Sequence, residues 1–147
     1  MSTQGASPAR RIPRCFPLLL VPGVFILFIA CSRGPILIGF AGPLSGVYSD
    51  LGVQGRNGAI LAADEINRNG GIAGRDLKIL PRDDLNNPER TRKVDRELIK
   101  RGVVAIVGHM TSTQSKAALP VAQEAQVPLI SPTASSPVLS GKKDMFF

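Results

Sequence analysis

Short apolar runs alternate with longer mixed stretches along the part of the chain that follows residue 31. The runs 35–40, 77–80, 103–107 and 127–130 consist mainly of Val, Ile, Leu and small residues. Nearly continuous apolar runs of this length are typical of strands that are buried on both faces of a sheet. The pattern therefore predicts four strands, and the clearest of them is 103–107.

The stretches between these runs have helical features. Residues from about 50 to 69 place apolar side chains at a rough helical period. Asn87 can cap a second helix, which Gly102 ends. A third helix is predicted to begin near Ser112, and Pro120 inside it predicts a kink or a restart.

Successive strand-and-helix units predict an α/β fold with a parallel, doubly wound sheet and right-handed crossovers. The expected strand order is 2-1-3-4, followed by a fifth element that residues 145–147 begin. In such a sheet, ligands bind outside the carboxyl ends of the strands, in the crevice between strands one and three. The loops that follow the strands are therefore the expected site.

The first 30 residues have the features of a secretion signal. A basic stretch precedes the mostly apolar run 15–30. As a helix, this run reaches only ~24 Å, which is short of a ~30 Å hydrocarbon core. The sequence Phe-Ile-Ala-Cys that ends at Cys31 is similar to the cleavage box of bacterial lipoproteins. We therefore expect residues 1–30 to be removed as a signal peptide. An acylated Cys31 would then anchor residues 31–147 at the periplasmic or extracellular face of a membrane. An uncleaved membrane anchor is the alternative.

Charge and cysteine content restrict the classes of function. The net charge is +7 for the whole chain, but residues 31–147 have 15 basic and 11 acidic side chains, a net charge of +4. The bases are spread singly along the sequence, and there is no Trp and one Tyr, which argues against nucleic acid as a partner. Cys15 leaves with the leader and Cys31 takes the lipid, so we expect no disulfide, metal site or cofactor in the domain.

Two loops rich in serine and threonine follow predicted strands, at 107–115 and 130–137. They offer hydroxyls, backbone N–H groups and the start of a helix, but no nucleophile beside a base and no cluster of metal ligands. Such groups suit the holding of a small polar molecule, not its chemical conversion, so we do not expect an enzyme. Ordinary turn chemistry is the alternative interpretation of each loop.

A zwitterionic amino acid would fit these groups. Its carboxylate requires donors, which the Ser112 hydroxyl and the amides near Thr113 supply. Its ammonium requires acceptors, which the Thr133 carbonyl and the Ser135 hydroxyl supply. An apolar ligand side chain would need an apolar wall, to which Leu51 or Tyr48 could contribute.

Other candidates are weaker. Asp83 and Asp84 follow a strand, as in a magnesium or phosphoacceptor pocket, but hydrogen bonding within the loop is the preferred interpretation. His109 can serve as a general base, but a structural histidine at a strand end is preferred, because no nucleophile is near it in the sequence. The turn 41–46 lacks the glycine spacing of a nucleotide loop.

Taken together, the motifs of this chain resemble those of the leucine/isoleucine/valine-binding family of periplasmic receptors, the solute-binding proteins of ABC importers. The resemblance implies the first lobe of a type I periplasmic binding fold, an amino acid or amide as ligand, and an ABC permease as membrane partner. It also implies contacts from Ser112, Thr133 and Ser135 to the carboxylate and ammonium of the ligand. Leu51 stands where the family often has an aromatic residue that covers the ligand. The segments that carry the resemblance are 42–46, 62–67 with 70–72, 83–84 with 87–88, 107–109 and 128–132.

Family members are more than twice as long as this chain and have a second lobe. We therefore expect residues 31–147 to be a partial N-terminal lobe, that is, a fragment that binds its ligand weakly. The leading function is capture of amino acids, branched-chain or related small solutes, for an ABC importer. The ligand-sensing domain of a membrane signalling receptor is an alternative, and a small flavodoxin-like enzyme is a weaker one.

Overall fold

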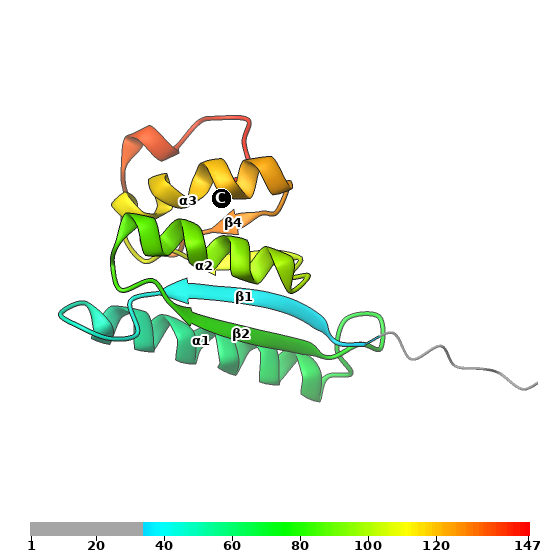
Figure 1. The fold of residues 1–147 in the computed structure, drawn as a ribbon. Coiled ribbons are helices and arrows are strands. Elements are labelled where there is room, and N and C mark those ends of the chain that lie inside the picture. Colours follow the sequence, from blue (N-terminus) through cyan, green and yellow to red (C-terminus); the bar gives the residue numbers. More distant parts are fainter. Residues whose placement is uncertain (1–33) are drawn as a thin grey trace, which may run out of the picture. The chain divides into compact units, whose positions relative to one another are not determined.

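Four parallel strands form the central sheet of the computed structural model, which describes residues 34–147 (Figure 1). The spatial order is β2-β1-β3-β4, as the sequence predicts. β1 and β2 extend further at their carboxyl ends than the apolar runs indicated, and β3 and β4 begin two residues later. The bounds are β1 Ile36–Gly42, β2 Leu77–Asp83, β3 Ala105–Gly108 and β4 Leu129–Ile130.

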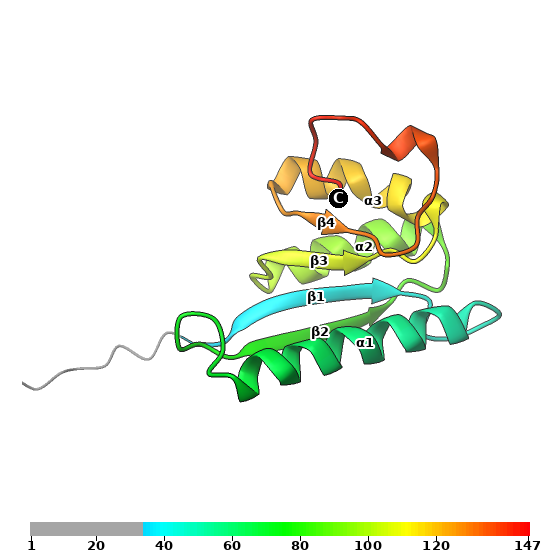
Figure 2. The same cartoon turned by 180° about the vertical axis from the view of Figure 1, so that it is seen from behind.

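Helices cover the sheet on both faces. α1 lies on one face, along β1 and β2, and α2 and α3 lie on the other (Figures 1 and 2). This division follows from right-handed crossovers, since the chain moves one way from β1 to β2 and the opposite way from β2 to β3. The helices are α1 Ser49–Arg68, α2 Pro88–Lys100 and α3 Ser112–Ala125, with a 3-10 turn η1 at Pro137–Leu139.

The core lies between the sheet and the pair α2 and α3. Val94 and Leu98 of α2 are fully buried, as are Ile106 of β3 and Leu129 of β4. These apolar side chains hold the sheet and the two helices together. The face of the sheet under α2 and α3 is therefore the better packed of the two.

The helix ends agree with the sequence in part. The Asn87 side chain accepts hydrogen bonds from the amides of Glu89 and Arg90 and caps α2, as predicted. Pro120 does not restart the third helix, because α3 is continuous across it. The proline is exposed, so water can satisfy the helix carbonyl that it leaves without a donor.

The last residues begin a fifth strand, as the sequence predicts. Phe146 forms a parallel bridge with Leu129 of β4. The amide of Phe147 donates to the Leu129 carbonyl over 2.9 Å, and the amide of Ser131 donates to the Phe147 carbonyl over 2.9 Å. The order 2-1-3-4-5 is thus present in outline.

The predicted signal peptide and Cys31 lie outside the described residues. Among residues 34–147, none of the helices is long and apolar enough to cross a membrane.

Two glycines of α1 provide a first test of the packing. A Cβ at Gly52 would overlap the backbone carbonyl of Pro43, whereas a Cβ at Gly58 would meet no atom within 4 Å. We expect Gly52→Ala to lower the free energy of unfolding by about 1–3 kcal/mol, because α1 must move away. Gly58→Ala is the matched control and should raise it by up to about 1 kcal/mol through helix propensity. Urea unfolding followed by circular dichroism measures both, and equal shifts would contradict the close contact.

Candidate ligand-binding site

The two polar loops lie side by side at the carboxyl end of the sheet and are joined by one hydroxyl. The Ser112 Oγ accepts hydrogen bonds from the amides of Ser135 and Ser136, each over 3.2 Å. Ser112 is the first residue of α3, and Ser135 lies in the loop that follows β4. The structure therefore brings together the two loops that the sequence predicts to form one site.

Two further hydroxyls fix the second loop against the first. The Ser131 Oγ donates to the His109 carbonyl over 2.6 Å and accepts from the Ala134 amide over 3.0 Å. The Thr133 Oγ1 donates to the Met110 carbonyl over 2.7 Å. The hydroxyl of Thr133 is thus used within the protein, which leaves its carbonyl, the group assigned to the ligand from the sequence.

The amino end of α3 has no side-chain cap. Its N-cap residue, Thr111, makes no side-chain hydrogen bond to the helix amides, in contrast to Asn87 at α2. The hydroxyl of Thr111 donates instead to the Asn86 side chain over 3.2 Å. The Ser112 hydroxyl does not cap α3 either, because it accepts hydrogen bonds from the amides of the loop after β4. The first amides of α3 are therefore available to an anion in the way that helix N-termini bind carboxylates.

The two remaining predicted residues lie at the edge of this arrangement. Thr113 is exposed and borders a hollow of about 330 Å³ together with Tyr48 and Asn86. Leu51 lies in the first turn of α1 and is 38% exposed. No described contact joins Leu51 to the two loops. The α1 helix approaches them through Gly55, at which an added Cβ would collide with the Met110 side chain.

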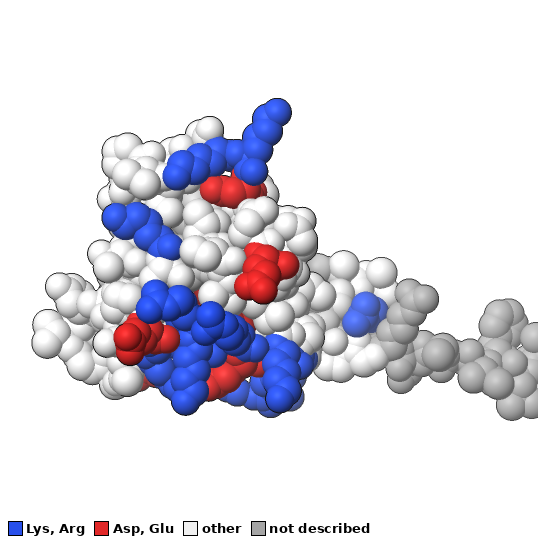
Figure 3. Space-filling model, turned by 45° about the horizontal axis from the view of Figure 1, so that its top comes forward, with Lys and Arg blue, Asp and Glu red and all other residues white. Residues whose placement is uncertain are grey.

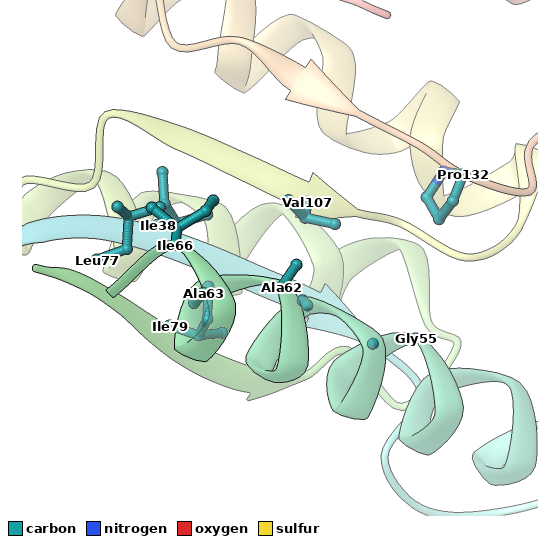
Figure 4. Close-up of a pocket in the computed structure, with 11 residues that line it drawn as sticks. Ile38, Gly55, Ala62, Ala63, Ile66, Leu77, Ile79, Val107 and Pro132 are labelled. Atoms are coloured by element: carbon teal, nitrogen blue, oxygen red, sulfur yellow. The ribbon is translucent and has the colours of Figure 1, made fainter. Parts of the chain in front are cut away.

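A separate hollow of about 540 Å³ lies over the other face of the sheet (Figure 4). It is bordered by α1, by Val107 of β3 and by Pro132. Its walls are aliphatic and offer nothing to hold a carboxylate or an ammonium. The hydroxyls and free amides that suit a zwitterion belong to the loops described above.

His109 lies beneath the first loop and is fully buried between two carboxylates. Its Nδ1 donates to Asp84 over 2.6 Å and its Nε2 donates to Asp95 over 3.1 Å. Both carboxylates are also fully buried. Burial alone would lower the pKa of His109, but the hydrogen bonds to Asp84 and Asp95 outweigh it and raise this pKa from 6.5 to about 9. The histidine is therefore a cation at neutral pH.

The structural interpretation of His109 is thus supported, but its partners were not predicted from the sequence. Its carbonyl accepts from the hydroxyls of Ser131 and, over 3.2 Å, Ser115. The residue therefore connects the loop after β2, α2, α3 and the loop after β4. The sequence does contain one signal for these partners: Asp95 is a charged residue at a position of α2 that faces the core.

Asp83 forms the loop hydrogen bonds that were expected of it, and also longer-range ones. Its carboxylate accepts from the amides of Leu85 and Leu44 and from the Ser45 hydroxyl. Burial would raise the pKa of Asp83, but these hydrogen bonds outweigh it and lower the pKa below 3.8. Among the described residues, no group of three or more His, Cys, Asp and Glu side chains is placed to hold a metal ion.

Comparison with known proteins assigns the family. The family model described as periplasmic binding protein matches residues 35–147, which is most of the chain. This chain belongs to the periplasmic binding protein family. The predicted resemblance is confirmed, and the family places the chain outside the cytoplasm, in the periplasm or at the cell exterior.

Relatives within this family bind amino acids and other small solutes. The leucine-, isoleucine-, valine-, threonine- and alanine-binding protein of Pseudomonas aeruginosa is 29% identical over 133 residues, 90% of this chain and 35% of that protein. The branched-chain amino acid transporter substrate-binding protein LivJ of Streptococcus pneumoniae, solved with isoleucine, is 37% identical with a TM-score of 0.74. The alignment covers 77% of this chain and 33% of LivJ.

A third relative widens the range of ligands in the periplasmic binding protein family. The solute-binding protein of an ABC transporter from Rhodopseudomonas palustris, solved with 3,4-dihydroxybenzoic acid, is 28% identical with a TM-score of 0.63. The alignment covers 71% of this chain and 28% of that protein. The chain thus spans about a third of the length of the relatives it matches. These relatives are substrate-binding proteins, which confirms the prediction that the chain is not an enzyme.

Proposed function

We propose that this chain forms the first lobe of an extracytoplasmic solute-binding protein that captures amino acids, branched-chain or related small solutes, for an ABC importer. One observation carries the proposal: the Ser112 hydroxyl joins the two loops directly beside the uncapped start of α3. This arrangement places donors and acceptors beside one another at the carboxyl end of the sheet. The names of the relatives, most of which are amino-acid-binding proteins, point in the same direction.

The carboxylate of the ligand is assigned to the α3 side. Ser112 accepts two amide hydrogens, so its own hydroxyl hydrogen remains to be donated. The amides of Thr113 and Gln114 have no partner within their helix, because they belong to its first turn. These three donors converge on an anion without requiring an arginine.

The ammonium and the ligand side chain are assigned to the other parts of the crevice. The Thr133 carbonyl and the Ser135 hydroxyl are the acceptors for the ammonium. Leu51, partly exposed on the first turn of α1, provides the apolar wall. An aliphatic wall suits an aliphatic side chain, so branched-chain amino acids are the ligands to test first.

The remaining parts of the proposal concern the membrane. An ABC permease is the expected partner of the loaded protein. We assign residues 1–30 to a signal peptide and the lipid anchor to Cys31, which would hold residues 31–147 beside that permease. Mass spectrometry of the protein from a bacterial membrane fraction would test the anchor, since an acylated Cys31 would be the new N-terminus.

A substitution at Ser112 tests the site. We expect Ser112→Ala to weaken leucine binding about tenfold, because it removes one donor to the carboxylate and the link to Ser135, together about 1.4 kcal/mol. Ser140→Ala is the matched control, because Ser140 is exposed beyond η1, and it should leave binding unchanged.

Backbone chemical-shift titration suits this test, because it detects weak binding and reports it residue by residue. Leucine should shift the amides of residues 112–114 and 133–135. Shifts confined to other parts of the domain, or equal affinities for the two variants, would reject the assigned site.

A further inference from the structure

The basic side chains gather on one face of the domain, although they are spread singly along the sequence. Figure 3 shows a dense group of lysines and arginines with acidic side chains among them, and separate, more scattered basic side chains elsewhere on that side. We call this group the basic face. It comprises Lys78, Arg82, Arg90, Arg92, Lys93, Arg96, Lys100 and Arg101.

The local pattern of α2 and β2 explains the gathering. In α2, the residues Thr91, Val94 and Leu98 are buried against the core, which turns Lys93, Arg96 and Lys100 toward solvent at helical spacing. In β2, Lys78 and Arg82 lie two residues to either side of Leu80 and therefore share its face of the strand. Leu80 packs in the core cluster with Val94 and Leu98 of α2, so this is the face that α2 covers. Two neighbouring elements thus present their charges in one direction.

This face is much more positive than the rest of the domain. It contains two acids, Glu89 and Glu97, among its eight bases. The rest of residues 34–147 has six bases and nine acids. Glu97 approaches Arg82 at 3.9 Å and Arg90 at 3.7 Å. These are long pairs between partly exposed side chains and contribute little to stability. Two of the nine acids outside the face, Asp84 and Asp95, are fully buried, so the remaining surface is close to neutral. The face therefore keeps a large net positive charge that the rest of the surface lacks.

The outermost charges are free. Among the described residues, neither an ion pair nor a side-chain hydrogen bond involves Lys93, Arg96 or Lys100. All three are exposed. A partner can therefore approach them without displacing an acid of the protein.

We propose that the basic face docks the domain onto a membrane surface that contains anionic phospholipids. The charge of the face complements such a surface, to which each nearby Lys or Arg adds attraction. The family places the chain outside the cytoplasm, where membrane headgroups are an anionic surface within reach. Single-stranded nucleic acid is disfavoured, because neither α2 nor β2 contains an aromatic residue on which bases could stack.

This docking is separate from the ligand crevice. The basic face lies over α2 and β2, whereas the proposed ligand groups lie in the loops that follow β3 and β4. A domain held by this face would remain beside the membrane with its crevice unobstructed. Failure of membrane docking and failure of ligand binding would therefore be observed independently.

Vesicle sedimentation of the full chain tests the proposal. The measured quantity is the partition coefficient onto vesicles of phosphatidylglycerol and phosphatidylcholine divided by that onto phosphatidylcholine alone, at low salt. The triple variant Lys93→Gln, Arg96→Gln, Lys100→Gln should lower this ratio by roughly 100-fold, about fivefold for each charge. The matched control, Lys116→Gln, Lys142→Gln, Lys143→Gln, removes the same charge elsewhere and should lower it by less than about threefold, since these lysines lie in α3 and after η1, outside α2 and β2.

Residues 1–33 are the same in every variant. Any affinity of these residues for lipid therefore cannot cause a difference in the partition ratio between the two triple variants. Raising the salt to about 0.5 M should remove most of the preference for phosphatidylglycerol, because the Debye length then falls well below 10 Å. Equal losses in the two triple variants would overturn the proposal. So would a ratio close to one for the unaltered chain, or tighter binding to single-stranded DNA than to the anionic vesicles.

Discussion

His109→Ala is expected to lower the free energy of unfolding by about 3–5 kcal/mol, the largest effect of any substitution considered, because it leaves two carboxylates buried without a cation. Asp84 and Asp95 are both fully buried, and His109 lies between them. The second oxygen of Asp95, Oδ2, already has no hydrogen-bond partner among the described residues. Removing the imidazolium therefore removes the main compensation for burying these charges.

Urea unfolding followed by circular dichroism measures this loss. His109→Gln keeps an amide donor and should lose less than His109→Ala. Adding Asp95→Asn to His109→Ala should restore part of the stability, because one of the uncompensated charges disappears. The contrary result is additivity, in which Asp95→Asn destabilises the His109→Ala protein as much as it destabilises the unaltered protein. The instability of His109→Ala would then come from the cavity left by the imidazole and not from the unpaired charges.

The consequences of this loss should extend to the proposed ligand site. The His109 carbonyl holds the hydroxyls of Ser115 and Ser131, and Ser131 in turn orders the loop that carries Ser135. Disturbing the imidazolium should therefore move both loops. Chemical-shift changes at 112 and at 131–135 in His109→Gln would report this movement in a protein that is still folded.

The sheet and its order were predictable because they depend on patterns that are local in the sequence. Each strand is a short apolar run, and each helix has its own period or caps, such as Asn87 at α2. Right-handed crossovers then leave few possible orders. The strand ends were less accurate, because β1 and β2 continue through polar or small residues such as Arg82 and Gly42, which pair without forming an apolar run.

The joining of the two loops was also predictable, since the carboxyl ends of adjacent parallel strands meet at one edge. The role of the Ser112 hydroxyl as an acceptor from the next loop was not, because it depends on the path of the chain after β4. The same limit applies to His109. Its partners are 25 and 14 residues away in the chain, on different elements, and only packing selects them from all the acids present.

The basic face illustrates the same limit for charge. Along the sequence, the bases are spread singly, and this spacing argues against nucleic acid as a partner. In the structure, the burial of Val94 and Leu98 turns the bases of α2 outward together. Spacing along the sequence therefore underestimates the clustering of charges where an amphipathic helix lies beside a strand whose basic residues share the face that the helix covers.

Stability should fall as the pH rises from about 6.5 to about 9, by about 3 kcal/mol in total. The folded-state pKa of His109 is raised to about 9 because hydrogen bonds to Asp84 and Asp95 outweigh the effect of burial, whereas the unfolded value is 6.5. Between these values, the folded state holds a proton that the unfolded state has lost. The contribution is therefore complete below pH 6.5, declines at up to about 1.4 kcal/mol per pH unit, and is absent above pH 9.

Urea unfolding at a series of pH values measures this slope, and the composition of the chain simplifies its assignment. His109 is the only histidine, so no other imidazole contributes. Cys15 and Cys31 are the only cysteines, and both should be replaced by serine in every protein compared, since thiols titrate near pH 8.5. In that background, His109→Gln should have nearly constant stability from pH 6.5 to 9, because its amide carries no proton to lose. A slope that persists in His109→Gln would assign the pH dependence to another group, and a flat profile in the parent would mean that the buried histidine is neutral between its two carboxylates.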